Sequence, residues 1–495
     1  MNDQGKSHRP MVPTKPPNQV RQPRTAEVVE GRGLAKENAG QQNTHRTQRR
    51  ARVPSELEGV RQAARRNKGE KFTALFHHVT VERLREAFMN LNKKAAAGSD
   101  GVTWEQYQAK LEENLQGLHR RLHQGAYRAK PSRRVYIPKT DGQQRPLAVA
   151  ALEDKIVQRA VVEVLNAIYE GDFLGFSYGF RPGRGAHQAL DALACGLRRK
   201  KMNFVFDADV RGFYESIDHA WMMKFVEHRI ADKRVLRLIQ KWLSTGVMEN
   251  GTLTECEDGA PQGATVSPLL ANIYLHYVLD LWAQQWRKRT ARGEMIITRY
   301  ADDFIVGFQY RDDAERFRQE LQERMKQFSL ELHPDKTRLI EFGRYAAGNR
   351  QRAGLAAPET FNFLGFTHIC GTTREGRFWV HRRTIQKRMT AKLHELKSEL
   401  RRRWHQPIPE QGRWLQQVVQ GYFGYHGVPG NERRLRSFRD QVTRLWLRTL
   451  RRRSQRDKTT WAQMGRLHRR WLPQVRWYHP WPEERFDARS KARTG

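Results

Sequence analysis

Two adjacent aspartates between short apolar runs constrain this chain more than any other feature. Residues 295–297 (MII) precede the tetrapeptide at 300–303 (YADD), and residues 304–306 (FIV) follow it directly. Apolar runs at this spacing predict two strands joined by a tight turn. Such a turn would hold two carboxylates at the exposed tip of a rigid hairpin, and oxygen ligands of this kind suit hard divalent cations such as Mg²⁺. An ordinary Asp-rich hairpin turn is the alternative, and the tetrapeptide alone does not decide between the two.

A second segment with aspartates strengthens the metal interpretation. In residues 206–210 (FDADV) the period of two of a strand places Asp207 and Asp209 on one face and three apolar side chains on the other. Buried aspartates in a strand are costly without a metal or a charged partner. If this strand lies beside the hairpin, Asp209 joins Asp302 and Asp303 in a cluster that can hold two cations. We interpret Asp207 as a structural neighbour of this cluster and not as a ligand.

Further sequence blocks surround these strands, and their order resembles one known family. That family is the group II intron-encoded reverse transcriptases, which also act as maturases. The resemblance covers roughly residues 80–450 and is carried by the segments at 98–103 (GSDGVT), 134–139 (RVYIPK), 145–147 (RPL), 176–184 (FSYGFRPGR), 207–219 (DADVRGFYESIDH), 261–275 (PQGATVSPLLANIYL), 333–337 (HPDKT), 363–366 (FLGF) and 421–431 (GYFGYHGVPGN).

The resemblance implies an α+β fold shaped like a right-hand polymerase. Fingers and palm of reverse-transcriptase type would be followed by an α-helical thumb/maturase domain. The implied activity is RNA-directed DNA synthesis by a protein that binds its intron RNA, assists splicing and supports retrohoming by making cDNA. Two other functions stay open at this point: an RNA-binding splicing cofactor without polymerase activity, and a host-adapted reverse transcriptase in phage defence.

The resemblance also implies which residues form the catalytic metal site. Two Mg²⁺ ions, with Mn²⁺ as a substitute, would support a phosphoryl transfer in which one ion activates the primer hydroxyl and the other stabilises the leaving pyrophosphate. Tyr300 and Ala301 would form the turn before the two adjacent aspartates. The implied ligands are the carboxylates of Asp209, Asp302 and Asp303 and the backbone carbonyl of Val210.

Five residues are implied to contact the incoming nucleotide. Lys139 and Arg145 would bind its phosphates, for which both side-chain types are suited, although each is open to the alternative of an ordinary surface cation. Phe213 or Tyr214 would lie under the sugar and exclude a 2′-hydroxyl, so that dNTP is selected; a core aromatic is the alternative for either. Gln262 would contact the nucleotide from a turn whose following glycine permits close backbone approach.

Net charge identifies the class of partner. The chain has 90 Lys and Arg against 53 Asp and Glu, a formal charge of +37. Residues 371–495 alone hold 31 basic and 10 acidic side chains, so the last quarter contributes +21. A polyanion is the usual partner of such a chain. The expected partners are group II intron RNA, an RNA template with its primer, a DNA target and dNTP; the oligomeric state stays open.

Composition and motif boundaries predict five segments. A basic, aromatic-poor tail would be disordered because it cannot bury enough apolar surface. The expected segments are the tail at 1–65, fingers and palm at 66–345, a palm-to-thumb connection at 346–374, the helical thumb/maturase domain at 375–455 and a basic DNA-binding segment at 456–495.

Several absences in the sequence set further expectations. No apolar run is long enough to span a membrane and no signal peptide begins the chain, so we expect a protein of the bacterial cytoplasm without a membrane partner. The three cysteines, Cys195, Cys256 and Cys370, are far apart. No Cys pair can hold zinc after residue 370, so we expect a family member without the zinc-containing endonuclease domain.

Overall fold

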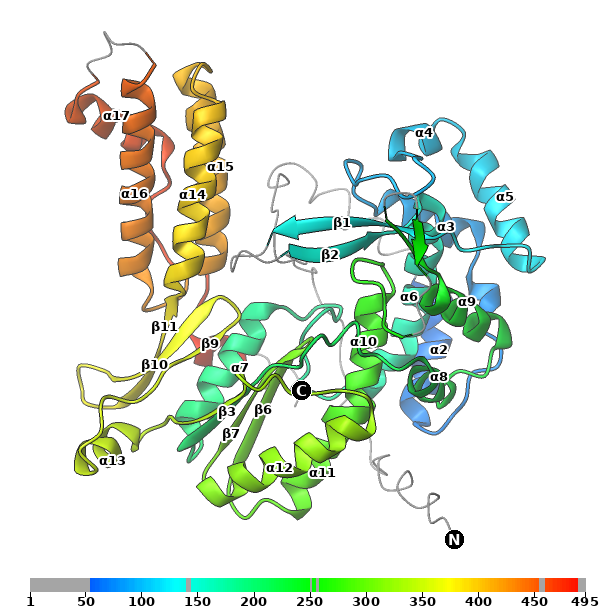
Figure 1. Ribbon diagram of the computed structural model, residues 1–495, viewed down its shortest axis with the longest axis horizontal. Helices are drawn as coiled ribbons and strands as arrows, with labels where there is room; N and C mark the ends of the chain where they lie inside the picture. The colour runs from blue at the N-terminus through cyan, green and yellow to red at the C-terminus, as the bar shows by residue number, and fades with distance from the viewer. Residues whose placement is uncertain (1–53, 139–143, 250–251, 255–257, 454–458, 488–495) are drawn as a thin grey trace.

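The computed structural model describes residues 54–138, 144–249, 252–254, 258–453 and 459–487. Its N-terminal part is a helical layer packed around one long helix, α6 (Leu152–Asp172), which is buried along most of its length. The main hydrophobic core includes the apolar side chains of α6, among them Val157, Val161, Leu165 and Ile168. The other helices of this layer are α2 (Pro54–Arg66), α3 (Val81–Met89), α4 (Trp104–Gln108) and α5 (Leu111–His123) (Figure 1).

The predicted disordered tail is wrong at its C-terminal end. Helix α2 begins at Pro54, and its Leu57 and Ala64 are buried in the main core, where α2 packs against α6. A short helix needs few apolar residues when a neighbouring helix covers them, and average composition does not detect this. The rest of the predicted tail, residues 1–53, lies outside the described residues.

A small sheet projects from the helical layer toward the middle of the molecule (Figure 1). Strand β1 (Ser132–Pro138) pairs antiparallel with β2 (Gln144–Val149) and parallel with β4 (Val247–Glu249). Strand β5 (Thr252–Thr254) completes the order β2-β1-β4-β5. The antiparallel pair of β1 and β2 is called the β1–β2 ribbon below. In it, Arg145 of β2 lies opposite Ile137 of β1.

The central sheet is antiparallel and has the order β6-β7-β3-β8. Strand β3 (Phe204–Ala208) lies between β7 (Asp303–Phe308) and β8 (Arg338–Glu341). Strand β6 (Met295–Tyr300) forms a hairpin with β7. The two apolar runs of the sequence are therefore the two arms of a hairpin, as predicted, and the aspartate-containing strand pairs with one of them.

Different helices cover the two faces of this sheet. Helix α7 (Ala186–Arg199) covers one face, where Val205 of β3 is buried. Helix α12 (Arg311–Gln327) covers the other, where Phe206 meets Phe317 with the ring centroids 6.1 Å apart. Alternate residues of β3 thus point into two separate cores. The remaining helices of this region are α8 (His219–Glu227), α9 (Lys233–Ser244), α10 (Ser267–Leu275), the π-helical turn η3 (His276–Asp280) and α11 (Leu281–Arg289).

The central sheet and the helices on its two faces form the palm. A third sheet connects this palm to the C-terminal helices. After the short helix α13 (Ala346–Arg352), it is formed by β9 (Phe361–Phe363), β10 (Phe366–Thr372) and β11 (Phe378–Thr384), all antiparallel.

The helical thumb predicted from residue 375 begins only at Gln386, because β11 occupies the residues before it. Within β11, Arg382 points inward and forms an ion pair with Asp191 of α7 at 2.7 Å.

Four helices then pack around one core and stand apart from the fingers (Figure 1). The first helix buries one apolar stripe formed by Met389, Leu393, Leu396 and Leu400. The expected separate segment from residue 456 shares this core, because Met464 and Leu472 are buried in it. The four helices are α14 (Gln386–Arg402), α15 (Ile408–His426), α16 (Glu432–Arg451) and α17 (Trp461–Trp471).

The chain after α17 returns to the palm. Glu483 forms an ion pair with Arg198 of α7, and Asp487 pairs with Arg199 at 2.8 Å. The ring of Trp481 lies edge-on against Trp379 of β11. This segment therefore links the thumb to the palm through its own acidic and aromatic side chains, and its contact with DNA stays a prediction. Among all helices in the described ranges, none is both long and apolar enough to cross a membrane.

Candidate active site

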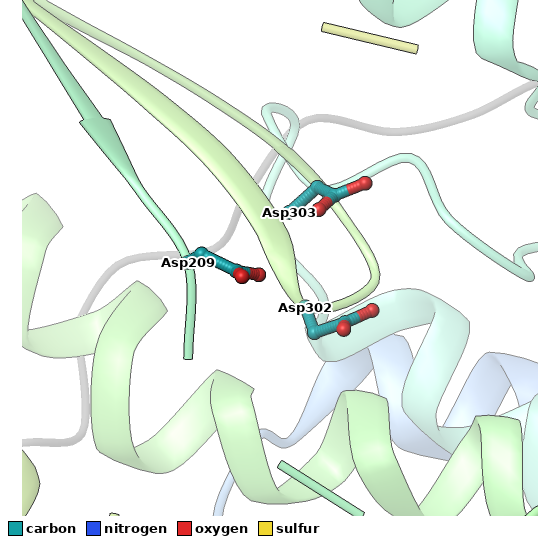
Figure 2. A group of neighbouring side chains, drawn as sticks. All are labelled: Asp209, Asp302 and Asp303. Carbon is teal, nitrogen blue, oxygen red and sulfur yellow. The ribbon is translucent and has the colours of Figure 1, made fainter. Parts of the chain in front are cut away.

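Three carboxylates meet at the edge of the central sheet. Ala208, the last residue of β3, pairs with Phe304 of β7, so Asp209 follows at the level of Asp303. Figure 2 shows Asp209 facing the hairpin turn that carries Asp302 and Asp303. One oxygen from each of the three side chains lies within 4.8 Å of the others, and all three residues are partly exposed. This is the only such group of metal-binding side chains in the part of the chain that the structure describes.

The chemistry of these donors fits a divalent cation. All three are oxygen atoms, which hard cations prefer, and their partial exposure leaves room for further ligands. Three carboxylates at this spacing repel one another, so a nearby positive charge stabilises them. Asp209, Asp302 and Asp303 form a carboxylate triad that can therefore hold a divalent metal ion.

Asp207, two residues before Asp209, has a different environment. It lies 3.3 Å from Arg338 of β8, and burial raises its pKa to about 6, with the Arg338 charge acting in the opposite direction. Asp207 is not part of the carboxylate cluster. Its partner is thus a side chain of the sheet itself, in line with its interpretation as a structural neighbour.

Lys336 is a residue of the site that sequence reasoning missed. Its Nζ lies 3.0 Å from Oδ2 of Asp209, and the backbone N–H of His333 donates to the carbonyl of Asp209 at 2.8 Å. Val210 joins the same segment through an antiparallel bridge to Leu332. The signal was present, since Lys336 belongs to the HPDKT block, but only the fold shows that this block lies beside Asp209.

The turn between β6 and β7 is tight and strained. Ala301 is buried and has φ of 58°, a left-handed conformation that residues other than glycine rarely adopt. Gly179 lies directly against it, and a Cβ at that position would be 2.3 Å from the backbone nitrogen of Ala301. Tyr300 is half-buried, with its ring 6.4 Å from that of Phe180. The turn is therefore held by a neighbouring loop, which the sequence did not reveal.

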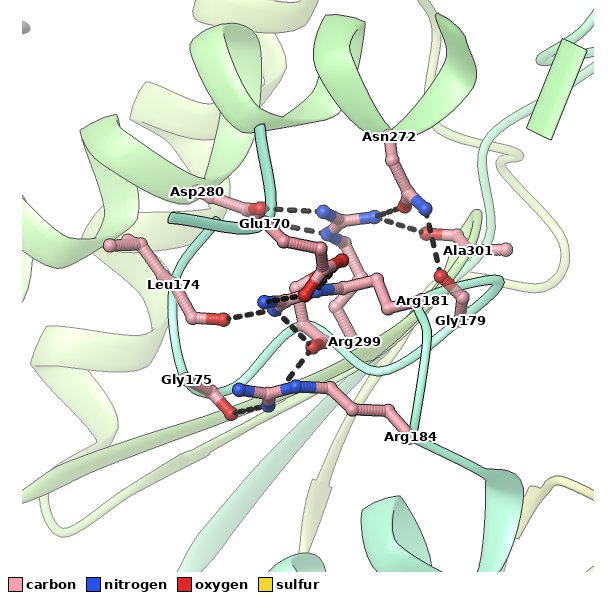
Figure 3. Close-up of polar contacts among 11 residues, drawn as sticks. Glu170, Leu174, Gly175, Gly179, Arg181, Arg184, Asn272, Asp280, Arg299 and Ala301 are labelled. Atoms are coloured by element: carbon pink, nitrogen blue, oxygen red, sulfur yellow. Dashed lines mark hydrogen bonds and ion pairs between the residues drawn. The ribbon is translucent and has the colours of Figure 1, made fainter. Parts of the chain in front are cut away.

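That loop is braced in turn by two arginines (Figure 3). Arg181 donates to the carbonyls of Leu174 and Ser177, each at 2.8 Å, and Arg184 donates to the carbonyl of Gly175 at 2.8 Å. The loop also extends the edge of β6, because backbone hydrogen bonds join residues 176 and 178 to residue 299. The FSYGFRPGR block, one of the segments that resemble the family, thus supports the turn that carries Asp302 and Asp303.

The two aromatic candidates differ in placement. Phe213 is 3% exposed and belongs to the main hydrophobic core. Tyr214 is partly exposed, and burial raises its pKa; the charge of Asp302 acts in the same direction, and that of Arg145 opposes it. Tyr214 is therefore within electrostatic range of both Asp302 and Arg145, whereas Phe213 is buried inside the protein.

The turn at Gln262 packs against the same ribbon. The carbonyl of Gln262 accepts the N–H of Ala148 at 2.6 Å, and its side chain donates to Glu215 at 3.2 Å. Gly263 has φ of 105°, and a Cβ there would lie 2.9 Å from the carbonyl of Ala148. The glycine thus permits a close approach to the protein's own backbone. Lys139 lies outside the described residues.

Known proteins share this domain. Residues 137–368 match the family model described as reverse transcriptase (RNA-dependent DNA polymerase). Protein YkfC of Escherichia coli strain K12 is 35% identical over 289 residues, which are 51% of this chain and 75% of YkfC. The group II intron-encoded protein LtrA of Lactococcus lactis subsp. cremoris is 33% identical over 231 residues, 46% of this chain but only 38% of LtrA. A 91 kDa protein in the cob intron of Schizosaccharomyces pombe is 39% identical over 146 residues, 30% of this chain and 18% of that protein.

A carboxylate triad at the edge of an antiparallel palm sheet, together with the matched domain, defines a polymerase of the reverse-transcriptase class. The chain belongs to the reverse transcriptase family, and within it to the group II intron reverse transcriptase/maturases. Its matched domain is that of an RNA-directed DNA polymerase, and nucleic acid is the partner of that class.

Proposed function

We propose that this protein is an RNA-directed DNA polymerase that binds its own group II intron RNA, assists its splicing and supports its insertion into DNA by cDNA synthesis. The observation that carries the proposal is the carboxylate triad, whose oxygens lie within 4.8 Å of one another on the palm sheet of a reverse transcriptase domain. Three carboxylates this close repel one another unless a cation lies between them, so their arrangement favours an active polymerase over a palm without catalytic activity.

Two Mg²⁺ ions are the proposed cofactors, held by Asp209, Asp302, Asp303 and the carbonyl of Val210, with Mn²⁺ as a substitute. When bound, they activate the primer 3′-hydroxyl and neutralise the charge of the leaving pyrophosphate. The chain's own contribution is to hold the carboxylates at a fixed spacing. Lys336, 3.0 Å from Asp209, supplies a positive charge beside them.

The nucleotide is proposed to bind between the triad and the β1–β2 ribbon. Arg145 presents a guanidinium for its phosphates, a role also expected of Lys139. Tyr214 is the proposed residue under the sugar, because Phe213 is buried in the core while Tyr214 lies near Asp302 and Arg145. Gln262 is proposed to contact the nucleotide from the neighbouring turn.

RNA is proposed to bind along the outer face of the thumb. On α16 the apolar side chains are buried inside the bundle. Arg433, Arg436 and Arg444 line a shallow hollow on its outside together with Asp440. Arginines in such an array suit phosphate groups, which dominate the affinity of proteins for nucleic acid.

The test of the function is primer extension on an RNA template by the purified protein and its Asp302→Asn variant. A lost metal ligand removes several kcal/mol of transition-state stabilisation, so we expect synthesis to fall by about three orders of magnitude. RNA affinity and splicing assistance should remain, because neither requires phosphoryl transfer by the protein.

Asp207→Asn is the matched control, since it removes the same charge from a nearby position of the same sheet. Its extension rate should stay close to that of the unmodified protein. Near-normal synthesis by Asp302→Asn would contradict the proposal.

A further inference from the structure

A buried arginine grips the turn that carries the metal ligands. Arg299, the residue before Tyr300, is fully buried. Its Nη1 donates to the carbonyl of Ala301 at 2.9 Å and to the side-chain oxygen of Asn272 at 3.0 Å (Figure 3). The carbonyl of Ala301 directly precedes Asp302, so the position of this carbonyl sets where the next backbone unit begins.

The charge of Arg299 is balanced by one buried carboxylate. Its Nε and Nη2 donate to the two oxygens of Asp280 at 2.7 and 2.5 Å, and both side chains are 0% exposed. A buried ion pair is weak evidence for stability, because apolar side chains of similar size often do as well. Such a pair does fix direction, since the planar guanidinium, held on one side by the carboxylate, aims its remaining nitrogen at the turn.

The backbone of the turn is strained, so a contact that fixes it has a physical purpose. Ala301 adopts the left-handed conformation that residues other than glycine rarely adopt. Asn272, which accepts from Arg299, also donates to the carbonyl of Gly179 at 2.8 Å, and Gly179 presses against Ala301 from the other side. Strand, helix and loop thus converge on one peptide unit of the turn.

We propose that Arg299 is a positioning residue for the catalytic metal. By holding the carbonyl of Ala301 it keeps Asp302 and Asp303 at the spacing at which they share a cation with Asp209. This inference rests on the proposed role of the triad. Groups that orient metal ligands typically change metal affinity or activity by 10- to 100-fold when they are removed, so an effect of about that size is expected here.

Two variants remove the hold without leaving an unpaired buried charge. Arg299→Lys keeps a cation beside Asp280 but lacks the planar fork that reaches Ala301. Arg299→Met combined with Asp280→Leu replaces the pair by apolar side chains of similar size. The control is Arg382→Met with Asp191→Leu, which removes a buried pair at the contact between α7 and β11, together with the ion pair of Asp191 with Arg485 at 3.2 Å.

Three measurements are made on each full-length protein: the thermal unfolding temperature, Mn²⁺ affinity by electron paramagnetic resonance, and the Mg²⁺ concentration for half-maximal primer extension. Asp302→Asn serves as the blank for Mn²⁺ bound outside the triad. Both Arg299 variants should bind Mn²⁺ roughly 10- to 100-fold more weakly and need correspondingly more Mg²⁺, with extension partly restored at high Mg²⁺. The control should keep the metal affinity and Mg²⁺ requirement of the unmodified protein.

Unchanged metal affinity in the folded Arg299 variants, or a loss no larger than in the control, would overturn the positioning role. An unmodified protein that binds Mn²⁺ at the triad but extends no primer would overturn the proposed function alone. An unmodified protein that binds no Mn²⁺ at the triad would overturn both.

Discussion

At the scale of single residues, location in the fold gives chemically similar side chains that are close in sequence different environments. Asp207 and Asp209 stand two positions apart near the end of one strand. Asp207 is paired with Arg338, whereas Asp209 lies beyond the strand end, where it meets the hairpin. The same applies to Phe213 and Tyr214, of which one is in the core and the other lies near Asp302.

A prediction at this scale concerns the choice of sugar. Tyr214→Ala should raise ribonucleotide incorporation relative to deoxyribonucleotide incorporation by roughly 10- to 100-fold, because the ring no longer fills the space of a 2′-hydroxyl. Single-nucleotide kcat/KM values for a matched rNTP and dNTP measure the ratio. Phe213→Leu is the control, and it should lower the unfolding temperature without moving the ratio. The opposite pattern would assign the sugar contact to Phe213.

At the scale of elements, the thumb depends on close approach between helices. Gly412 of α15 faces Trp471 of α17, and a Cβ on Gly412 would lie 2.5 Å from the indole ring. A Cβ added to Gly421, on the same helix, would meet no atom within 4 Å. The first glycine is therefore needed for packing, whereas the second only lowers helix propensity.

This difference predicts opposite effects of one substitution. Gly412→Ala should destabilise the thumb by about 1–3 kcal/mol, because the half-buried ring of Trp471 must shift. Gly421→Ala should stabilise it by about 0.5–1 kcal/mol, because alanine is the better helix former. Urea unfolding of the full chain, followed by tryptophan fluorescence, measures both. Equal effects at the two positions would mean that α17 does not pack on α15 in this way.

At the scale of the whole molecule, charge is distributed unevenly. The palm triad is acidic, while residues 371–495 carry +21 of the formal +37. Part of this positive charge is used inside the protein, as in the pair of Arg382 with Asp191. The arginines on the outer face of α16 point away from the thumb core. We therefore propose that they bind RNA phosphates.

The corresponding prediction is a change in the salt dependence of RNA binding. Replacing Arg433, Arg436 and Arg444 together by glutamine should reduce the slope of log affinity against log salt by about 2–3, since each lost phosphate contact contributes about 0.7–0.9. Filter binding or fluorescence anisotropy over a salt series gives the slope.

The control removes equal charge from the palm. It replaces exposed residues of α12 by glutamine, namely Arg311, Arg318 and Lys326. Its slope should match that of the unmodified protein, and an equal reduction in both variants would contradict a thumb-specific phosphate contact.

Local sequence pattern was sufficient for the parts of the site that depend on near neighbours. The meeting of Asp209 with Asp302 and Asp303 depended on the strand lying beside the hairpin, which only the fold decides. A period of two along residues 206–210 and two apolar runs around YADD were enough to predict the strands and the hairpin. They succeeded because strand alternation and turn chemistry depend on neighbours within a few residues. The family resemblance added the right-hand architecture and the helical thumb.

The side chains that support the hairpin and Asp209 from distant parts of the sequence became known only from the folded chain. Asn272 and Gly179 are 93 residues apart, and Lys336 and Asp209 are 127 apart. Helix α2 and the segment after α17 likewise owe their order to partners far along the chain. Local pattern states which side of an element a residue occupies, but the partner on that side is chosen by packing. Buried polar groups need partners wherever the chain brings them, so these contacts are settled only when the whole fold forms.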